Sequence, residues 1–208
     1  MSISTDAIKK MLLTGAERVI EARDELTDID SRFGDADHGI TMEKIMKALA
    51  GAVRDFSGEG GVKALLDNVS MAIMTINGGS AVPLWTTLFD GLSEGAPSSG
   101  EMSVDELKAM FRSGLEAFKA LSKAKVGDKT MTDALEPAVE ALCACNGGLA
   151  EVMKAAAEGA EAGAAATVNF TAKFGRAKSY GERTIGTPDA GAMSMKYFFR
   201  GLAEGAGE

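Results

Sequence analysis

Three aspartates and a histidine lie close together near the start of the chain, between Asp30 and Thr41. Asp30, Asp35 and Asp37 fall within eight residues, and His38, the only histidine of the chain, follows at once. Carboxylates without thiols or further imidazoles suit a hard cation. Mg²⁺ is usually held by one or two carboxylates and completed by water and substrate phosphates. The spacing therefore favours a site for Mg²⁺ together with a polyphosphate.

A helix-capping turn is the alternative interpretation of the same residues. An Asp-rich turn with glycines often precedes a helix only to cap it, and Asp37 would then be the capping residue. His38 would equally suit a structural role. An EF-hand loop is excluded by the spacing, because no glutamate stands at its twelfth position. These residues alone leave the metal site and the capping turn open.

Length and composition favour one acidic globular domain spanning residues 1–208. Hydrophobic residues make up 46% of the chain and charged residues 25%, so a sizeable core is available. The net charge of −8 opposes nucleic acid or an anionic membrane as partner. It also means that a phosphate ligand needs local cations or backbone amides.

The sequence further indicates a cytoplasmic protein. No secretory signal is evident at the amino terminus. The longest uncharged run, residues 71–89, is interrupted by Asn77-Gly78-Gly79-Ser80 and by Pro83, which opposes a membrane-spanning helix. Cys143 and Cys145, two apart in a helical pattern, project to different faces, so we expect reduced, buried thiols.

Helical periodicity recurs along almost the whole chain, and alternating strand patterns of any length are absent. We therefore predict an all-α fold in which the Met and aromatic stripes form the core. A capping box at Ser103 opens the fifth helix, and Pro137 is expected to kink the sixth. The expected helices cover about 5–26, 42–56, 62–76, 83–92, 103–121, 131–143, 149–169 and 189–202.

The connections between these helices divide into two groups. If consecutive helices pack antiparallel, alternate connections share one end of the bundle. The odd-numbered connections carry the acidic cluster, a Gly-Gly-Ser turn, the stretch Gly127-Asp128-Lys129-Thr130 and a long basic loop. The even-numbered ones are ordinary turns. One end is thus predicted to be functional, at connections 27–37, 77–82, 122–130 and 174–188, and the other structural, at 58–61, 95–100 and 146–148.

Each functional connection leads into a helix, whose free amides and positive dipole end attract phosphate. Gly78-Gly79-Ser80 would bring bare amides and a hydroxyl against it, although Gly78 alone is better explained as the C-cap of the preceding helix. Arg176 would neutralise phosphate, although a solvated arginine is the commoner case. The prediction depends on the convergence of these signals at one end.

Taken together, these stretches resemble the L subunit of dihydroxyacetone kinase, the nucleotide-binding half of a bacterial kinase of small ketoses. The resemblance covers nearly the whole chain. It is carried by Gly34-Asp35-Ala36-Asp37-His38-Gly39, Gly78-Gly79-Ser80-Ala81-Val82-Pro83-Leu84, Gly127-Asp128-Lys129-Thr130-Met131, Gly175-Arg176-Ala177, Gly181-Glu182-Arg183 and Asp189-Ala190-Gly191-Ala192.

The resemblance implies a closed barrel of eight antiparallel amphipathic helices, with nucleotide and two Mg²⁺ ions at one rim. Asp30, Asp35 and Asp37 match the metal-binding aspartates. The positions that match contacts to ADP or ATP are His38, Gly39, Ile40, Thr41, Gly79, Ser80, Ser122, Thr130, Met131, Arg176, Asp189, Ala190 and Gly191.

The resemblance also implies a divided enzyme. A histidine of a separate K-type subunit holds the sugar, so this chain is expected to carry no sugar-binding catalytic residue and to act only with that partner. The substrate is dihydroxyacetone or another short ketose such as erythrulose. Either ATP is the donor, or bound ADP is rephosphorylated by a phosphotransferase-system phosphocarrier. We also expect a homodimer.

Two other classes of function remain open. The first is a nucleotide-sensing module that signals through a protein partner, such as a transcriptional regulator, without turnover. The second is a helical scaffold that binds metal incidentally.

The chain departs from the family pattern at Ala36, where glycine is usual, at Ser80-Ala81-Val82, which replaces Ala-Ser-Gly, and at Ala190, which replaces proline. These departures concern the phosphate geometry and the choice of ketose, not the metal aspartates.

Overall fold

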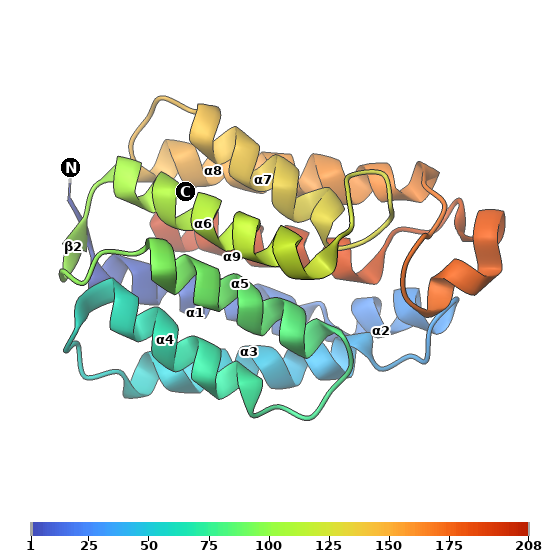
Figure 1. Cartoon of the computed structure of the whole chain (residues 1–208), viewed down its shortest axis with the longest axis horizontal. Helices are drawn as coiled ribbons and strands as arrows, with labels where there is room; N and C mark the ends of the chain where they lie inside the picture. The colour runs from blue at the N-terminus through green and yellow to red at the C-terminus, as the bar shows by residue number, and fades with distance from the viewer. Residues whose placement is uncertain (1, 208) are drawn as a thin grey trace.

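The computed structural model describes residues 2–207, and α-helices make up most of it (Figure 1). The predicted all-α fold is confirmed, with one short antiparallel pairing of β1 (Ile3–Ser4) with β2 (Glu101–Met102) in addition. The α-helices are α1 (Thr5–Glu21), α2 (Arg23–Ser31), α3 (His38–Asp55), α4 (Gly61–Met74), α5 (Ala81–Gly95), α6 (Val104–Ser122), α7 (Thr132–Ala144), α8 (Leu149–Ala166) and α9 (Ala190–Ala206). Two 3₁₀ segments are η1 (Thr167–Asn169) and η2 (Arg176–Thr184).

Each of the eight predicted helices is present, but the first one is longer than expected and divided. It breaks at Ala22 and resumes as α2, which ends at Ser31. The predicted end at Leu26 is wrong because Leu26 and Ile29 continue the apolar spacing and are both buried. Asp30 therefore lies in the last turn of a helix, where its backbone is held by hydrogen bonds, and not in the following loop.

Neighbouring helices pack in chain order around a common core. From α3 to α9 each helix contacts the next, α1 packs on α3, and α9 packs on α1 as well as on α8. This cyclic order is what the predicted barrel requires, and the closed barrel itself stays a prediction. Aromatic side chains fill the interior: the rings of Trp85 and Phe198 meet edge to face at 5.0 Å, and Phe89 lies 6.2 Å from Phe198.

Helices α7 and α8 approach each other closely, as the small side chains of α8 predict. A Cβ at Gly163 would lie 2.0 Å from the carbonyl oxygen of Asp133, and one at Gly159 would lie 2.5 Å from that of Pro137. Pro137 lies inside α7 and has no N–H to donate to the carbonyl of Asp133, four residues earlier. The glycines of α8 thus let the two backbones touch where α7 lacks a hydrogen bond.

The structure bears on the predictions about membrane-spanning helices and about the two cysteines. None of the helices in the described part of the chain is long and apolar enough to cross a membrane. Cys143 and Cys145 are free, in agreement with the prediction, although both are half-buried where full burial was expected.

The two groups of connections lie at opposite ends of the bundle. In Figure 1 the end of α2, the start of α3, the α4–α5 and α6–α7 connections and η2 all lie at the right. The turns between α3 and α4 and between α7 and α8 lie at the left, with both termini. The predicted alternation is confirmed, and the right-hand end is called the functional end below.

Candidate functional site

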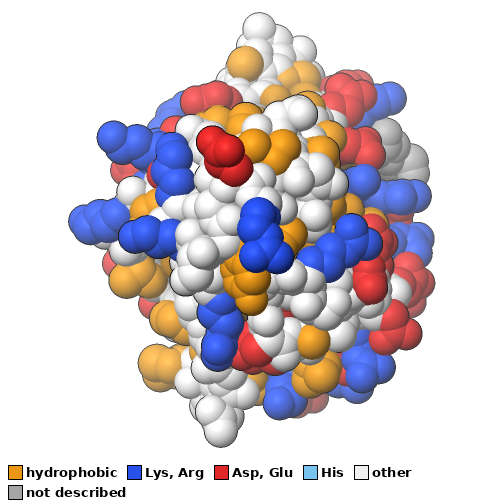
Figure 2. Space-filling model, turned by 90° about the vertical axis from the view of Figure 1, so that its right-hand side faces the viewer, with side chains coloured by type: hydrophobic (Ala, Val, Ile, Leu, Met, Phe, Trp, Pro, Cys, Tyr) orange, Lys and Arg blue, Asp and Glu red, His pale blue; other side chains and the backbone are white. Residues whose placement is uncertain are grey.

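A cavity of about 580 Å³ opens at the functional end. Its lining draws on all four odd-numbered connections, which are distant in sequence. Figure 2 looks onto this end, where Lys and Arg side chains project at several places although the chain as a whole is acidic. The convergence that the sequence predicted is therefore present in space.

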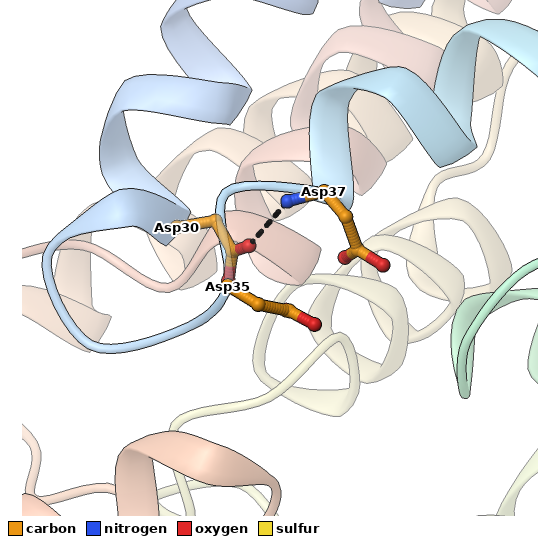
Figure 3. A group of neighbouring side chains, drawn as sticks. All are labelled: Asp30, Asp35 and Asp37. Carbon is orange, nitrogen blue, oxygen red and sulfur yellow. Dashed lines mark hydrogen bonds between the residues drawn. The ribbon is translucent and has the colours of Figure 1, made fainter.

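Three carboxylates meet at this cavity (Figure 3). One oxygen from each of Asp30, Asp35 and Asp37 lies within 4.8 Å of the others. Asp30 comes from the last turn of α2, and the other two come from the loop before α3. The Asp30 carboxylate accepts hydrogen bonds from the backbone N–H groups of Asp37 at 3.1 Å and His38 at 3.4 Å. Backbone amides thus fix Asp30 before any ligand binds.

The loop after α2 folds back tightly onto that helix. The N–H of Gly34 donates to the carbonyl of Asp30 at 2.6 Å, and a Cβ at position 34 would lie 2.0 Å from the Asp30 carboxylate. Glycine is therefore required there. Two residues later Ala36 takes a φ of +60°, a left-handed conformation that costs a residue with a side chain about 1–2 kcal/mol. This is the position where the family pattern has glycine.

The capping-turn interpretation does not describe the aspartate cluster. Asp37 stands at the N-cap position of α3, but its side chain makes no capping hydrogen bond. Instead its pKa is raised, first by burial and then by the charges of Asp35 and Asp30. One cation compensates part of this repulsion, because Arg176 pairs with Asp35 at 2.6 Å. Three converging carboxylates with one arginine among them fit a hard divalent cation.

His38 lines the cavity and is also held by the protein. Its Nε2 lies 2.6 Å from the Oγ of Ser194, and that hydroxyl also contacts the carbonyl of Ala190 at 3.0 Å. Burial lowers the pKa of His38, so the ring is neutral near pH 7. The structural role weighed for this histidine is therefore present alongside its place in the cavity wall.

The third connection, between α4 and α5, offers the donors expected of a phosphate site. Helix α4 ends at Met74 with Thr75 as its C-cap, so the explanation of Gly78 as a C-cap is wrong. A Cβ at Gly78 would lie 2.9 Å from the Thr41 side chain, whereas one at Gly79 would meet no atom within 4 Å. Gly79, Ser80 and Thr41 line the cavity directly before and beside the start of α5. The backbone at Gly79 therefore faces open space, where a ligand has room.

The remaining predicted residues form the other half of the cavity. Phe118, Leu121 and Met131 give it an apolar surface, and Ser122 and Thr130 lie beside them. The segment Asp189 to Gly191 closes this half from the start of α9. The Asp189 carboxylate caps α9 by accepting the N–H of Ala192 at 2.8 Å, and burial raises its pKa to about 7.

Two of the predicted contact residues lie outside the cavity lining. Gly39 packs against α2, since a Cβ there would lie 2.1 Å from the carbonyl oxygen of Arg23. Ile40 is 39% exposed and belongs to the outer surface of α3. The other predicted residues, Arg176 included, all line the cavity.

Comparison with known proteins places the chain in a family. The family model described as the DAK2 domain matches residues 32–204. The chain belongs to the DAK2 domain family. The likeness to L-type subunits read from the motifs is confirmed by relatives that match over most of their length, one in Escherichia coli and one in Listeria innocua.

The Escherichia coli relative is named as the ADP-binding subunit DhaL of a PEP-dependent dihydroxyacetone kinase, and it is 33% identical over the full length of both chains. A Listeria innocua subunit of the same kind is 35% identical over 83% of this chain and 81% of its own. A D-erythrulose kinase of Mycolicibacterium smegmatis is also 35% identical, but this chain spans only 33% of it.

Solved structures agree on the fold. A dihydroxyacetone kinase from C. freundii, in its native form, superposes with a TM-score of 0.73 at 25% identity, covering 95% of this chain and 34% of that one. The same enzyme in complex with AMP-PNP and Mg²⁺ gives the same TM-score over 94% of this chain at 24% identity. The likeness to this complex supports the DAK2 fold alone.

The other departures from the family pattern are accommodated differently from Ala36. Val82 lies in the first turn of α5, where a helical backbone requires no glycine, and it is buried. Ala190 is the first residue of α9 and lines the cavity. The departure that carries backbone strain is therefore Ala36, between Asp35 and Asp37.

Lys129 is a cavity residue that the sequence did not single out as a contact. It is 5% exposed, and its ammonium group donates to the carbonyls of Thr167 and Thr187. Lysine is rarely buried, so periodicity gives no signal for it. The signal that the sequence offered was its place between Gly127-Asp128 and Thr130. In the structure its backbone φ is +61°.

Proposed function

We propose that this chain is the ADP- or ATP-binding and Mg²⁺-binding subunit of a kinase for dihydroxyacetone or a related short ketose, with residues 1–208 acting as one domain. The observation that carries the proposal is the meeting of Asp30, Asp35 and Asp37 within 4.8 Å at a cavity large enough for a nucleotide. The match to ADP-binding subunits over full length supports it.

In this proposal Asp30, Asp35 and Asp37 would hold two Mg²⁺ ions at the phosphate end of the cavity. Bound Mg²⁺ would neutralise phosphate charge and stabilise the charge that develops during phosphoryl transfer. The amides and hydroxyl of Gly79 and Ser80, at the start of α5, donate to phosphate oxygens. Arg176, which lies beside Asp35, would add a positive charge for phosphate.

The apolar half of the cavity then receives the nucleoside. Phe118, Leu121 and Met131 supply surface for a flat base, and Ser122 and Thr130 supply hydroxyls beside it. His38, Thr41 and the segment Asp189 to Gly191 complete the contacts inside the cavity. Gly39 and Ile40 do not line the cavity. They would contribute at the start of α3 through their backbone amides or by shaping the loop before it.

The division of labour follows the relatives. The sugar would be held by a histidine of a K-type partner, and this chain would deliver the phosphoryl group. Relatives are named as PEP-dependent and PTS-dependent, so we favour bound ADP that is rephosphorylated by a phosphocarrier protein. A homodimer, contact with a transcriptional regulator and a cytoplasmic location stay predictions.

The test is turnover by the purified chain with and without a K-type subunit. We expect the chain alone to bind ADP in the presence of Mg²⁺ and to phosphorylate no ketose, and the pair to phosphorylate dihydroxyacetone when a phosphoryl donor is supplied. Binding of ADP without turnover by the pair under either donor would instead favour the nucleotide-sensing module. Steady phosphorylation by the chain alone would refute the division of labour.

A further inference from the structure

The seventh connection lies against the aspartate loop through two different contacts. We call residues 175–186 the cover segment and residues 32–37 the aspartate loop. The first contact is the ion pair of Arg176 with Asp35 at 2.6 Å. The second joins the rings of Tyr180 and Phe33, whose centroids are 5.2 Å apart at an angle of 57°. Phe33 lines the cavity, whereas Tyr180 lies outside its lining and is 39% exposed.

Hydrogen bonds hold the chain on both sides of the first half of the cover segment. Before it, Lys173 binds Asp128 through its N–H at 3.1 Å and through its ammonium group at 2.6 Å. After it, the N–H of Ala172 donates to the Thr184 hydroxyl at 3.0 Å, and the N–H of Gly186 donates to the carbonyl of Val168 at 2.8 Å. Between Gly175 and Gly181, which take φ values of +61° and +56°, the two side-chain contacts join the segment to the aspartate loop.

In the proposed function Asp35 is a metal ligand, and in this structure one of its carboxylate oxygens, Oδ2, is paired with Arg176. A divalent cation that bound this oxygen would displace the guanidinium group. Arg176 would then be released for phosphate. Without a second contact, the first half of the cover segment would then lose its link to the aspartate loop, and Arg176 would reach phosphate only at an entropic cost.

We propose that Tyr180 is a positioning residue: its contact with Phe33 keeps Arg176 beside the phosphate site after the metal has taken Asp35. The inference rests on the proposed function and adds a residue that does not touch the nucleotide. Arg183, whose guanidinium lies 5.5 Å from the centre of the Tyr180 ring, packs on the same ring. Both contacts of Tyr180 are made by its ring, so we expect the ring and not the hydroxyl to position Arg176.

The experiment is a double-mutant cycle on MgADP affinity, measured by calorimetry, with circular dichroism to verify folding. Tyr180→Ala should weaken binding about 3- to 10-fold, the range expected for a lost aromatic pair. Tyr180→Phe keeps the ring and should bind within about twofold of the unmodified protein. Ile185→Ala is the matched control, because Ile185 lies in the same segment, is 50% exposed and is not a cavity residue.

The decisive comparison uses the Arg176→Ala background. If Tyr180 acts through Arg176, adding Tyr180→Ala there should change affinity by less than about twofold. The same loss in both backgrounds, or no loss from Tyr180→Ala in the otherwise unmodified protein, would overturn this inference alone. Failure of the unmodified protein to bind MgADP would overturn the proposed function, and this inference with it.

Discussion

Two acidic side chains at helix starts, Glu106 at the far end of the bundle and Asp37 at the functional end, differ in what they contact. At the far end, Glu106 accepts hydrogen bonds from the N–H and hydroxyl of Ser103 at 2.7 and 2.8 Å, and these bonds lower its pKa. At the functional end, Asp37 makes no capping bond, and its pKa is raised by burial and by its acidic neighbours. Glu106 thus stabilises a helix, whereas the three aspartates repel one another and are compensated in part by Arg176.

Two turn glycines, one from each end, show a second difference. At the far end, Gly61 has a φ of +65°, and a Cβ there would lie 2.1 Å from the carbonyl oxygen of Ser99. At the functional end, a Cβ at Gly79 would meet no atom within 4 Å. A glycine that is enclosed by its own chain serves the fold, and one that faces open space leaves its amide accessible to a ligand.

The largest effect is expected when an acid of the functional end is replaced and compared with one of the far end. Asp35→Ala should abolish Mg²⁺-dependent ADP binding in calorimetry while helicity by circular dichroism persists, because the cation loses a charged ligand. Glu106→Ala, at the far end, should lower the melting temperature and leave ADP affinity intact. Unchanged ADP affinity in the Asp35 variant would refute the metal assignment.

A smaller effect is expected at the one arginine of the cluster. Arg176→Ala should weaken MgADP binding by on the order of 1.5–3 kcal/mol, the cost of a lost charge-assisted contact. Arg200, which pairs with Glu204 in the last turns of α9, is the control, and its replacement by alanine should leave affinity nearly unchanged. Equal affinities in the two variants would mean that Arg176 is a solvated surface charge.

The glycine comparison is tested by unfolding in urea. Gly61→Ala should lower the free energy of unfolding by about 1–3 kcal/mol, because alanine is strained at a positive φ and meets the Ser99 carbonyl. Gly79→Ala should change it by less than about 0.5 kcal/mol. If the two variants lost the same stability, the distinction between enclosed and open glycines would fail.

The smallest effect concerns pH. The Asp189 pKa is raised from 3.8 to about 7, so between these values the unfolded chain is ionised while the folded one keeps its proton. Stability should therefore fall as the pH rises through this window and level off above it. Because Asp189 is only half-buried by surface area, we expect about 1–2 kcal/mol between roughly pH 5 and 7.5.

The matched variant is Asp189→Asn, which keeps an acceptor for the Ala192 N–H but cannot ionise. Urea unfolding at the two pH values should show a smaller fall in stability for this variant than for the unmodified protein. At the far end the sign is reversed, since the lowered pKa of Glu106 means that its stabilisation is lost as the pH falls. If the free energy of unfolding fell by the same amount in Asp189→Asn and in the unmodified protein, Asp189 would not be the cause of the fall.

Much of this arrangement could be predicted from the sequence. Periodicity located the helices, and short connections between antiparallel neighbours brought four loaded loops to one end. The predicted helix ends were less accurate. Helix α2 continues to Ser31, with Leu26 and Ile29 buried, and helix α4 ends before Gly78. Helix ends depend on burial by other segments, which the local pattern does not contain.

The sequence placed these loops at one end of the bundle, but it did not predict which side chains would pair. The pairing of Arg176 with Asp35 and the contact of Tyr180 with Phe33 join residues that are far apart in sequence. The burial of Lys129 depends on carbonyls supplied by two other segments. Such contacts arise only when the bundle has formed, because Asp35, Lys129 and Arg176, each taken alone, are of types that mostly lie on a solvated surface.

The central claim is that the three aspartates form a metal site joined to a nucleotide site. Crystals grown with ADP and Mn²⁺, a substitute for Mg²⁺ that scatters anomalously, test it most directly. We predict anomalous peaks within bonding distance of the carboxylates of Asp30, Asp35 and Asp37, with ADP phosphates on their other side. ADP in the cavity without an anomalous peak at these carboxylates would contradict the account.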